Sequence, residues 1–204
     1  MENLQKPIYQ HELTEQSFDR FLPAYLKTAS RLYFTPIEVA KKAAEWLTET
    51  NASRILDIGA GTGKFCITGA KYSDSHFYGV EHRESLAKTG NTIAQHFGLN
   101  NVSIFHANIL DISFSEYDAF YLFNPFYENL EFVKRLNDEV ELEENMYQVY
   151  LNHTEEQLDK AQAGTRLVTY HGNNFEVPNS YKKETEAFNG ELKLWIKQEK
   201  NDHE

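Results

Sequence analysis

The residues with the clearest chemical potential lie in ILDIGAGTGKF, residues 55–65, where a β-like run leads directly into three glycines. The glycines at 59, 61 and 63 would let a ligand approach the backbone closely, because they carry no side chain. A phosphate-binding loop needs GxxxxGK followed by Ser or Thr, but Ile58 replaces its first glycine and Phe65 replaces its magnesium-binding hydroxyl residue. A nucleoside triphosphate is therefore disfavoured as the ligand.

An acidic residue just before the glycines separates two other ligand classes. A dinucleotide-binding loop needs GxGxxG, and Lys64 stands at its third glycine. Asp57 at the end of the strand would repel a pyrophosphate, whereas it would favour a ligand that carries an ammonium and a sulfonium group. S-adenosylmethionine carries both charges, so it is the favoured ligand and a nicotinamide cofactor is the alternative.

The segment DIGAGTGKF resembles motif I of the class I S-adenosylmethionine-dependent methyltransferases, in which an acidic residue precedes GxGxG. The resemblance extends over about residues 35–197. It implies that S-adenosylmethionine is the cofactor and that this segment contributes the cofactor-binding residues Asp57, Gly59, Ala60, Gly61 and Gly63.

Two further positions match the same family. Glu81 ends the second predicted strand, 22 residues after Gly59, where the family has an acid that accepts hydrogen bonds from both ribose hydroxyls. Asn108 and Ile109 follow the third predicted strand, where the family contacts adenine. The resemblance therefore implies cofactor contacts at these three residues.

The expected acceptor site follows the apolar run Ala119–Phe123, because ligands of open α/β sheets lie beyond the carboxyl ends of the central strands. The next residues, NPFY at 124–127, resemble the Asn/Asp-Pro-Pro-aromatic motif of amino-group methyltransferases, with one proline missing. The resemblance implies that Asn124, Pro125 and Phe126 position the acceptor, and that Asn124 also contacts the cofactor.

Thr35 has two interpretations. The segment YFTP, residues 33–36, is similar to a Phe-Thr-Pro element near the methionine end of the cofactor in some of those enzymes, which implies a cofactor contact for Thr35. Alternatively, Thr35 is the N-cap of a helix over residues 36–49, with Pro36 at the first position and Glu38 completing a capping box.

Methyl transfer is an in-line displacement at an activated sulfonium, so alignment at about 3 Å can supply much of the rate without a dedicated base. An amine acceptor must be uncharged when it attacks. Asn124 could orient its lone pair, and Tyr127, Glu128 or water could take the proton. His171 ends a predicted strand on the ligand side and could also reach a substrate.

Strands and helices alternate along the chain in the way that would position these residues. Strands are predicted at 54–58, 76–80, 102–106, 119–123 and 165–170, and helices at 36–49, 64–71, 83–97 and 146–163. Asn189-Gly190 predicts a tight hairpin within 180–197, whose second strand, 192–197, would suit the sheet edge. The expected fold is a doubly wound, mostly parallel seven-stranded α/β sheet with helices on both faces and a C-terminal antiparallel hairpin.

Composition limits the location and the partners. The chain has 204 residues, no apolar run long enough to span a bilayer and no signal-like amino terminus, so no membrane and a cytoplasmic location are expected. Cys66 is the only cysteine and is interpreted as a small buried residue, and the histidines lack the spacing of a metal site, so no metal is expected. The net charge of −11 would repel a phosphate backbone, which disfavours nucleic acid as a partner.

These patterns predict a helical extension at residues 1–34 that covers the active site, and an S-adenosylmethionine-binding methyltransferase domain at 35–204. The acceptor is not identified, and a small molecule or a protein is favoured over nucleic acid. One alternative is an amino-group methylase that acts on nucleic acid or a protein amide through NPFY. The other is a non-catalytic regulatory protein that binds S-adenosylmethionine.

Overall fold

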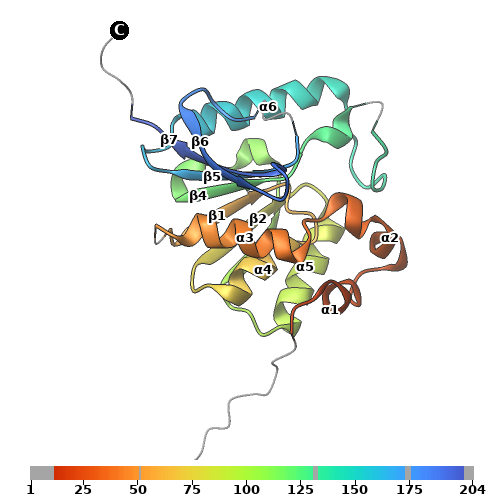
Figure 1. The fold of residues 1–204 in the computed structure, drawn as a ribbon. Coiled ribbons are helices and arrows are strands. Elements are labelled where there is room, and N and C mark those ends of the chain that lie inside the picture. Colours follow the sequence, from red (N-terminus) through yellow and green to blue (C-terminus); the bar gives the residue numbers. More distant parts are fainter. Residues whose placement is uncertain (1–11, 51, 131–132, 173–175, 200–204) are drawn as a thin grey trace, which may run out of the picture.

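The computed structural model describes residues 12–50, 52–130, 133–172 and 176–199, and these residues form a seven-stranded sheet (Figure 1). The strand order is β3-β2-β1-β4-β5-β7-β6. The first five strands pair in parallel, β7 pairs antiparallel with β5, and β6 pairs antiparallel with β7. The strands are β1 (Arg54–Ile58), β2 (His76–Glu81), β3 (Val102–His106), β4 (Ala119–Leu122), β5 (Arg166–Tyr170), β6 (Tyr181–Ala187) and β7 (Leu192–Lys197). The predicted fold class is confirmed.

Helices cover both faces of the sheet because its central strands are apolar on both sides. All four residues of β4 are buried, and β4 lies in the middle of the strand order, as its unbroken apolar run predicts. One face carries α3 (Ile37–Thr48), α4 (Lys64–Tyr72) and α5 (Glu84–His96), and the other carries α6 (Glu144–Asp159) (Figure 1). Short 3₁₀ turns, Ile109–Asp111, Phe114–Glu116 and Tyr127–Asn129, pack with α6.

Two short helices precede the first strand, α1 (Glu15–Asp19) and α2 (Ala24–Tyr33). Phe18 of α1, Leu26 of α2 and the flanking residues Leu13 and Leu22 are buried in the same apolar cluster as α3, α4 and α5. The described part of the amino-terminal extension is therefore built into the core on that face of the sheet. Residues 1–11 of the predicted extension lie outside the described part of the chain.

The predicted capping box of α3 is wrong. The helix begins at Ile37 with Pro36 at the N-cap, and no side chain of its own first turn caps it. Instead, a carboxylate oxygen of Glu15 accepts a hydrogen bond from the backbone N–H of Ile37 at 2.6 Å. The Thr35 hydroxyl points elsewhere and hydrogen-bonds the Tyr121 hydroxyl at 2.8 Å in the protein interior. The side chain of Glu15, 22 positions away, therefore caps the start of α3 in place of a neighbouring residue.

The predicted edge position of residues 192–197 is also wrong, because β7 lies between β5 and β6. Leu192 and Leu194 of β7 are buried, whereas residues 182–186 of β6 are exposed and mostly charged. Charged residues on an edge strand discourage pairing with another chain, which suits β6 to that place. Asn189 and Gly190 both adopt positive φ in the connecting turn, as the hairpin prediction requires.

Within the described ranges, no helix is long and apolar enough to cross a membrane.

Candidate active site

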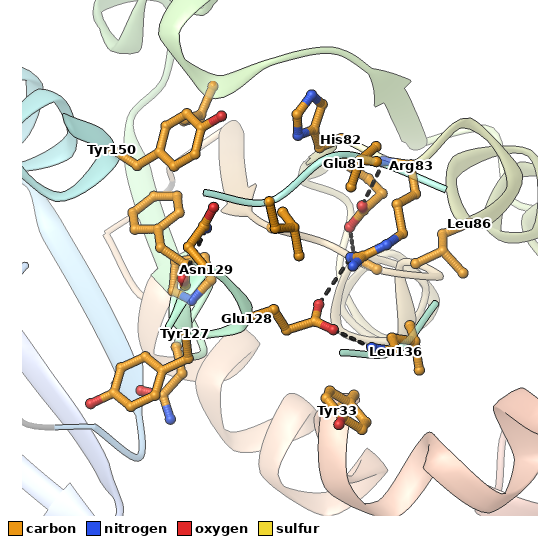
Figure 2. Close-up of a pocket in the computed structure, with 18 of the residues that line it drawn as sticks. Tyr33, Glu81, His82, Arg83, Leu86, Tyr127, Glu128, Asn129, Leu136 and Tyr150 are labelled. Carbon is orange, nitrogen blue, oxygen red and sulfur yellow. Dashed lines mark hydrogen bonds and ion pairs between the residues drawn. The ribbon is translucent and has the colours of Figure 1, made fainter. Parts of the chain in front are cut away.

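A pocket of about 270 Å³ opens at the carboxyl ends of the parallel strands (Figure 2). Its walls come from the glycine loop after β1, the end of β2, the turn after β3 and the loop after β4. The predicted site residues that line it are Gly59, Gly61, Glu81, Asn108, Ile109, Asn124, Pro125 and Phe126. The fold has therefore brought together segments that are up to 67 positions apart in the sequence.

The glycine loop packs directly on the loop after β4. Gly59 has a φ of +76°, and a Cβ there would lie 2.6 Å from the Pro125 Cβ. A Cβ on Gly61 would lie 2.9 Å from the ring of Phe34. Residues with side chains would separate these segments, so glycine is required for the predicted cofactor loop to meet the predicted acceptor loop.

Glu81 is a buried carboxylate in the pocket wall. One oxygen accepts a hydrogen bond from the backbone N–H of Gly61 and the other from that of Arg83, both at 2.8 Å (Figure 2). Burial raises the pKa of Glu81, and the two backbone donors and the Arg83 charge oppose the rise. Each carboxylate oxygen has further acceptor capacity, so Glu81 can also receive the hydroxyls of a ribose.

Four predicted cofactor residues lie behind the pocket wall, because Thr35, Asp57, Ala60 and Gly63 are not among its lining residues. Asp57 is buried against Cys66, whose Sγ donates to its carboxylate at 3.4 Å. Burial raises the pKa of Asp57 to about 7, and the charge of Glu81 contributes to the rise. Gly63 begins α4 in a left-handed conformation, where a Cβ would meet the Ile104 side chain at 2.0 Å.

Asn108 lies at the turn that follows β3. Its side-chain oxygen accepts from the backbone N–H of Leu110 at 3.0 Å and caps the 3₁₀ turn that begins at Ile109. Its amide nitrogen donates to the Tyr150 hydroxyl at 3.3 Å, which links this turn to α6. The backbone around Asn108 and Ile109 is thereby held at the pocket wall.

The NPFY loop adopts a strained conformation at its first residue. Asn124 has a φ of +43°, which is uncommon for a residue with a side chain. Its Oδ1 is buried without a hydrogen-bond partner among the described residues, 2.3 Å from the position of a Cβ on Gly172. Phe126 stacks on Tyr150 with 5.4 Å between ring centroids. A buried amide oxygen without a partner is a candidate ligand contact.

One side of the pocket is closed by contacts that local sequence patterns did not predict. Arg83 pairs with Glu128 at 2.9 Å (Figure 2). Arg83 also donates to the Asn137 side chain at 2.8 Å. The Tyr33 hydroxyl donates to the backbone carbonyl of Lys134 at 2.6 Å. These contacts hold residues 133–142 beside the pocket. No local signal could have indicated them, because Arg83 and Glu128 are 45 positions apart.

The glycine loop, the buried acid after β2 and the pocket between them match a known family. Residues 49–200 match the family described as a methyltransferase domain. The chain belongs to this family. Residues 49–200 therefore form an S-adenosylmethionine-dependent methyltransferase domain, and the open glycine backbone and the Glu81 carboxylate in the pocket wall fit that cofactor.

Solved methyltransferases share the fold. An RNA methyltransferase from Salinibacter ruber, crystallised with S-adenosyl-L-homocysteine, has a TM-score of 0.53 at 18% identity and covers 83% of this chain and 97% of its own. An O-methyltransferase from Bacillus cereus, also in complex with S-adenosylhomocysteine, has a TM-score of 0.59 at 13% identity and covers 93% and 94%.

Curated relatives correct one expectation about this methyltransferase. The 23S rRNA (uracil(1939)-C(5))-methyltransferase RlmD of Enterobacter sp. (strain 638) is 31% identical over 128 residues, which are 53% of this chain and 30% of the relative. RlmD of Shewanella sediminis is 34% identical over 99 residues, 43% and 22% of the two chains. The chain thus spans less than a third of these relatives. Because they are named for a nucleic acid, the conclusion from net charge that nucleic acid is disfavoured is wrong.

Proposed function

We propose that this methyltransferase transfers the methyl group to a nitrogen of a base in RNA. The observation that carries the proposal is an exposed basic rim beside the pocket that contains the NPFY loop. The names of the curated relatives support RNA as the substrate class. The polar and aromatic residues of the NPFY loop support a planar acceptor with an N–H group.

The basic rim consists of Lys27, Arg31, Lys134 and Arg135, all exposed. Lys27 and Arg31 are four residues apart on α2, so they share one face of that helix. The hydrogen bond from Tyr33 to the Lys134 carbonyl places this end of α2 beside residues 134–135. Exposed Leu32 and half-buried Tyr33, at the same end of α2, line the pocket, whereas the four basic residues lie outside its lining.

For a phosphate backbone the charges within about 10 Å matter more than the net charge of the protein, because salt screens the more distant charges. Two of the acids near the rim are engaged, whereas Asp138, Glu141 and Glu143 farther along the same segment are exposed. Glu128 is paired with Arg83, and Glu139 accepts from the backbone N–H of Ser85 at 2.8 Å. Lys27, Arg31 and Lys134 have no ion-pair partner among the described residues. They are therefore available for phosphates.

Cys66 argues for nitrogen over carbon as the methylated atom. The C5 carbon of a uracil ring becomes nucleophilic once a nucleophile such as a thiolate adds to the neighbouring carbon. Cys66 is the only cysteine of the chain, and it is fully buried beneath the sheet. Burial and the neighbouring Asp57 raise its pKa well above the ordinary value of a thiol. A buried, neutral thiol cannot serve as that nucleophile.

The NPFY loop can hold a planar amine. Pro125 and Phe126 form part of the wall, and the Tyr127 ring makes an edge contact with Tyr147 at a centroid distance of 6.0 Å. Asn124 supplies an amide that can accept from the amino group and direct its lone pair toward the sulfonium methyl. The nitrogen–carbon bond then forms as the carbon–sulfur bond breaks, in line.

The test incubates the full chain with tritiated S-adenosylmethionine and an unmodified 23S rRNA transcript, followed by digestion to nucleosides and chromatography. Incorporation into an N-methylated nucleoside is expected. The variant Arg31→Gln/Lys134→Gln should weaken binding of the same RNA and lower the dependence of binding on salt by about two phosphate contacts. The matched variant Lys88→Gln/Lys182→Gln changes the same charge away from the rim and should leave binding unchanged.

Label in 5-methyluridine would overturn the choice of nitrogen. Label that appears in protein from a cell extract while the transcript stays unlabelled would overturn the choice of RNA.

A further inference from the structure

A second strained residue lies next to Asn124, at the end of β5. His171 has a φ of +57°, and in the described part of the chain the other positive-φ residues with side chains are Asn124 and the hairpin-turn residues Phe188 and Asn189. Because β4 and β5 pair in parallel, Asn124 and His171 leave neighbouring strands at the same edge of the sheet. The Asn124 Oδ1 lies against Gly172, the residue after His171. Backbone strain of this kind concentrates at functional sites.

The imidazole of His171 is held in one orientation. Its Nδ1 lies 2.6 Å from a carboxylate oxygen of Glu191, and its backbone N–H donates to the backbone carbonyl of the same residue at 2.8 Å. The ring packs against Tyr170 and Phe123, with centroid distances of 4.0 and 5.5 Å. Phe123 also lines the pocket, so the imidazole lies one ring away from the pocket wall.

A carboxylate on Nδ1 determines the state of the other ring nitrogen. When Nδ1 donates its proton to Glu191, Nε2 keeps a lone pair and can accept a proton. The carboxylate also stabilises the imidazolium that forms, which is the arrangement of a base and its orienting acid. The His171 side chain is 40% exposed, so a proton taken up there can pass to water.

We propose that His171, oriented by Glu191, accepts the proton that the acceptor nitrogen loses during methyl transfer. The nitrogen forms its bond to the methyl carbon, the carbon–sulfur bond breaks and S-adenosylhomocysteine leaves. The N–H proton then moves to Nε2, and Glu191 balances the new charge. This role rests on the proposed nitrogen acceptor.

Tyr127 and Glu128, the other candidates for this proton, both line the pocket. Glu128 is engaged by Arg83 and by the backbone N–H of Leu136. Among the described residues, the titratable groups that contact His171 are Glu191 and Tyr170. The buried Glu176 lies on the far side of Gly172, 3.7 Å from the position of a Cβ on that glycine. Burial raises the pKa of Glu176, and Glu176→Gln is therefore the necessary comparison.

The experiment uses His171→Gly and His171→Asn, because glycine and asparagine both tolerate the positive φ of this position. With the 23S rRNA transcript, turnover should fall at least about 100-fold in both variants. S-adenosylhomocysteine affinity should stay unchanged. Added imidazole should restore activity to His171→Gly, and the loss of rate toward acid pH should disappear. The exposed His106→Gln should behave as the wild type.

Two results would overturn the proposal. One is unchanged turnover in His171→Gly, and the other is loss of the acid limb in Glu176→Gln while His171→Asn retains it. A nitrogen-15 spectrum of the free protein tests the arrangement without any acceptor. The proton of the neutral ring should reside on Nδ1 and should leave that site in Glu191→Gln. This measurement does not depend on the transcript being a substrate. A proton on Nε2 in the free wild-type protein would overturn the proposed orientation by Glu191.

Discussion

The ammonium of Lys64 and the carboxylate of Glu15 form an ion pair between the first residues of α4 and α1. Lys64 is 2% exposed and also lies 3.6 Å from Asp19 and 3.2 Å from the Ser30 hydroxyl. The other oxygen of Glu15 caps α3 at Ile37. One carboxylate thus joins three helices, and one of them begins directly after the glycine loop.

Replacing Lys64 by methionine should destabilise the protein by about 2 kcal/mol, because Glu15 and Asp19 would lose their shared cation in a partly buried site. The loss is smaller than for a fully buried pair because Glu15 is half exposed. Urea unfolding measures the change. The exposed pair Lys42–Glu45 provides the control, and Lys42→Met should change stability by less than about 0.5 kcal/mol. Equal changes in the free energy of unfolding would show that the Lys64 pair stabilises the protein no more than an exposed pair does.

The Glu81→Gln variant should bind S-adenosylhomocysteine about 10- to 100-fold more weakly, because hydrogen bonds from ribose hydroxyls to a charged acceptor contribute about 1.5–3 kcal/mol. Titration calorimetry measures the affinity. Glu84→Gln, three positions away on the exposed first turn of α5, is the matched control. Similar affinities for Glu81→Gln and wild type would remove Glu81 from the cofactor site.

Asp57 should make the stability of the free protein fall as pH rises from about 4 to about 7. Burial raises the pKa of this carboxyl from 3.8 to about 7, so in that range the folded protein holds a proton that the unfolded chain has lost. Unfolding therefore releases a proton in this range, so the free energy of unfolding declines as pH rises. The Asp57→Asn variant should lose this decline and gain stability relative to wild type above pH 7.

Thermal unfolding across this pH range checks the Asp57 prediction. Asp74→Asn, which changes an exposed carboxyl, should leave the wild-type profile unaltered. A parallel decline in Asp57→Asn and wild type would mean that Asp57 is ionised in the folded protein.

The Cys66→Ala variant should retain methyl transfer to RNA and lose about 1 kcal/mol of stability, because a small buried side chain is removed and no nucleophile is lost. Initial rates with the 23S rRNA transcript and urea unfolding measure the two effects. A folded variant with abolished transfer would point to a covalent thiol mechanism and against nitrogen methylation.

Local patterns were sufficient for the parallel core of the sheet. The continuous apolar run at residues 119–122 and the buried segment 55–58, which contains one acid, Asp57, specify buried strands. The glycine loop between strand and helix specifies the ligand end. The order of the final two strands was not specified in this way. Residues 192–197 alternate apolar and polar side chains, which suits an edge strand as well as an internal one. The places of β6 and β7 follow from which of them pairs with β5.

The sequence by itself determined the class of fold, the cofactor and the loops that meet at the pocket, because each depends on residues close together in the chain. Tertiary structure alone decided that Glu15 caps α3, that Arg83 meets Glu128, that Asp57 lies behind the pocket wall and that Glu191 orients His171. It also decided that Tyr33, at the end of α2, hydrogen-bonds the backbone of Lys134. Apart from the contact between Asp57 and Cys66, these relationships join residues 20 to more than 100 positions apart. The energy of such contacts depends on tertiary packing, which no local pattern encodes.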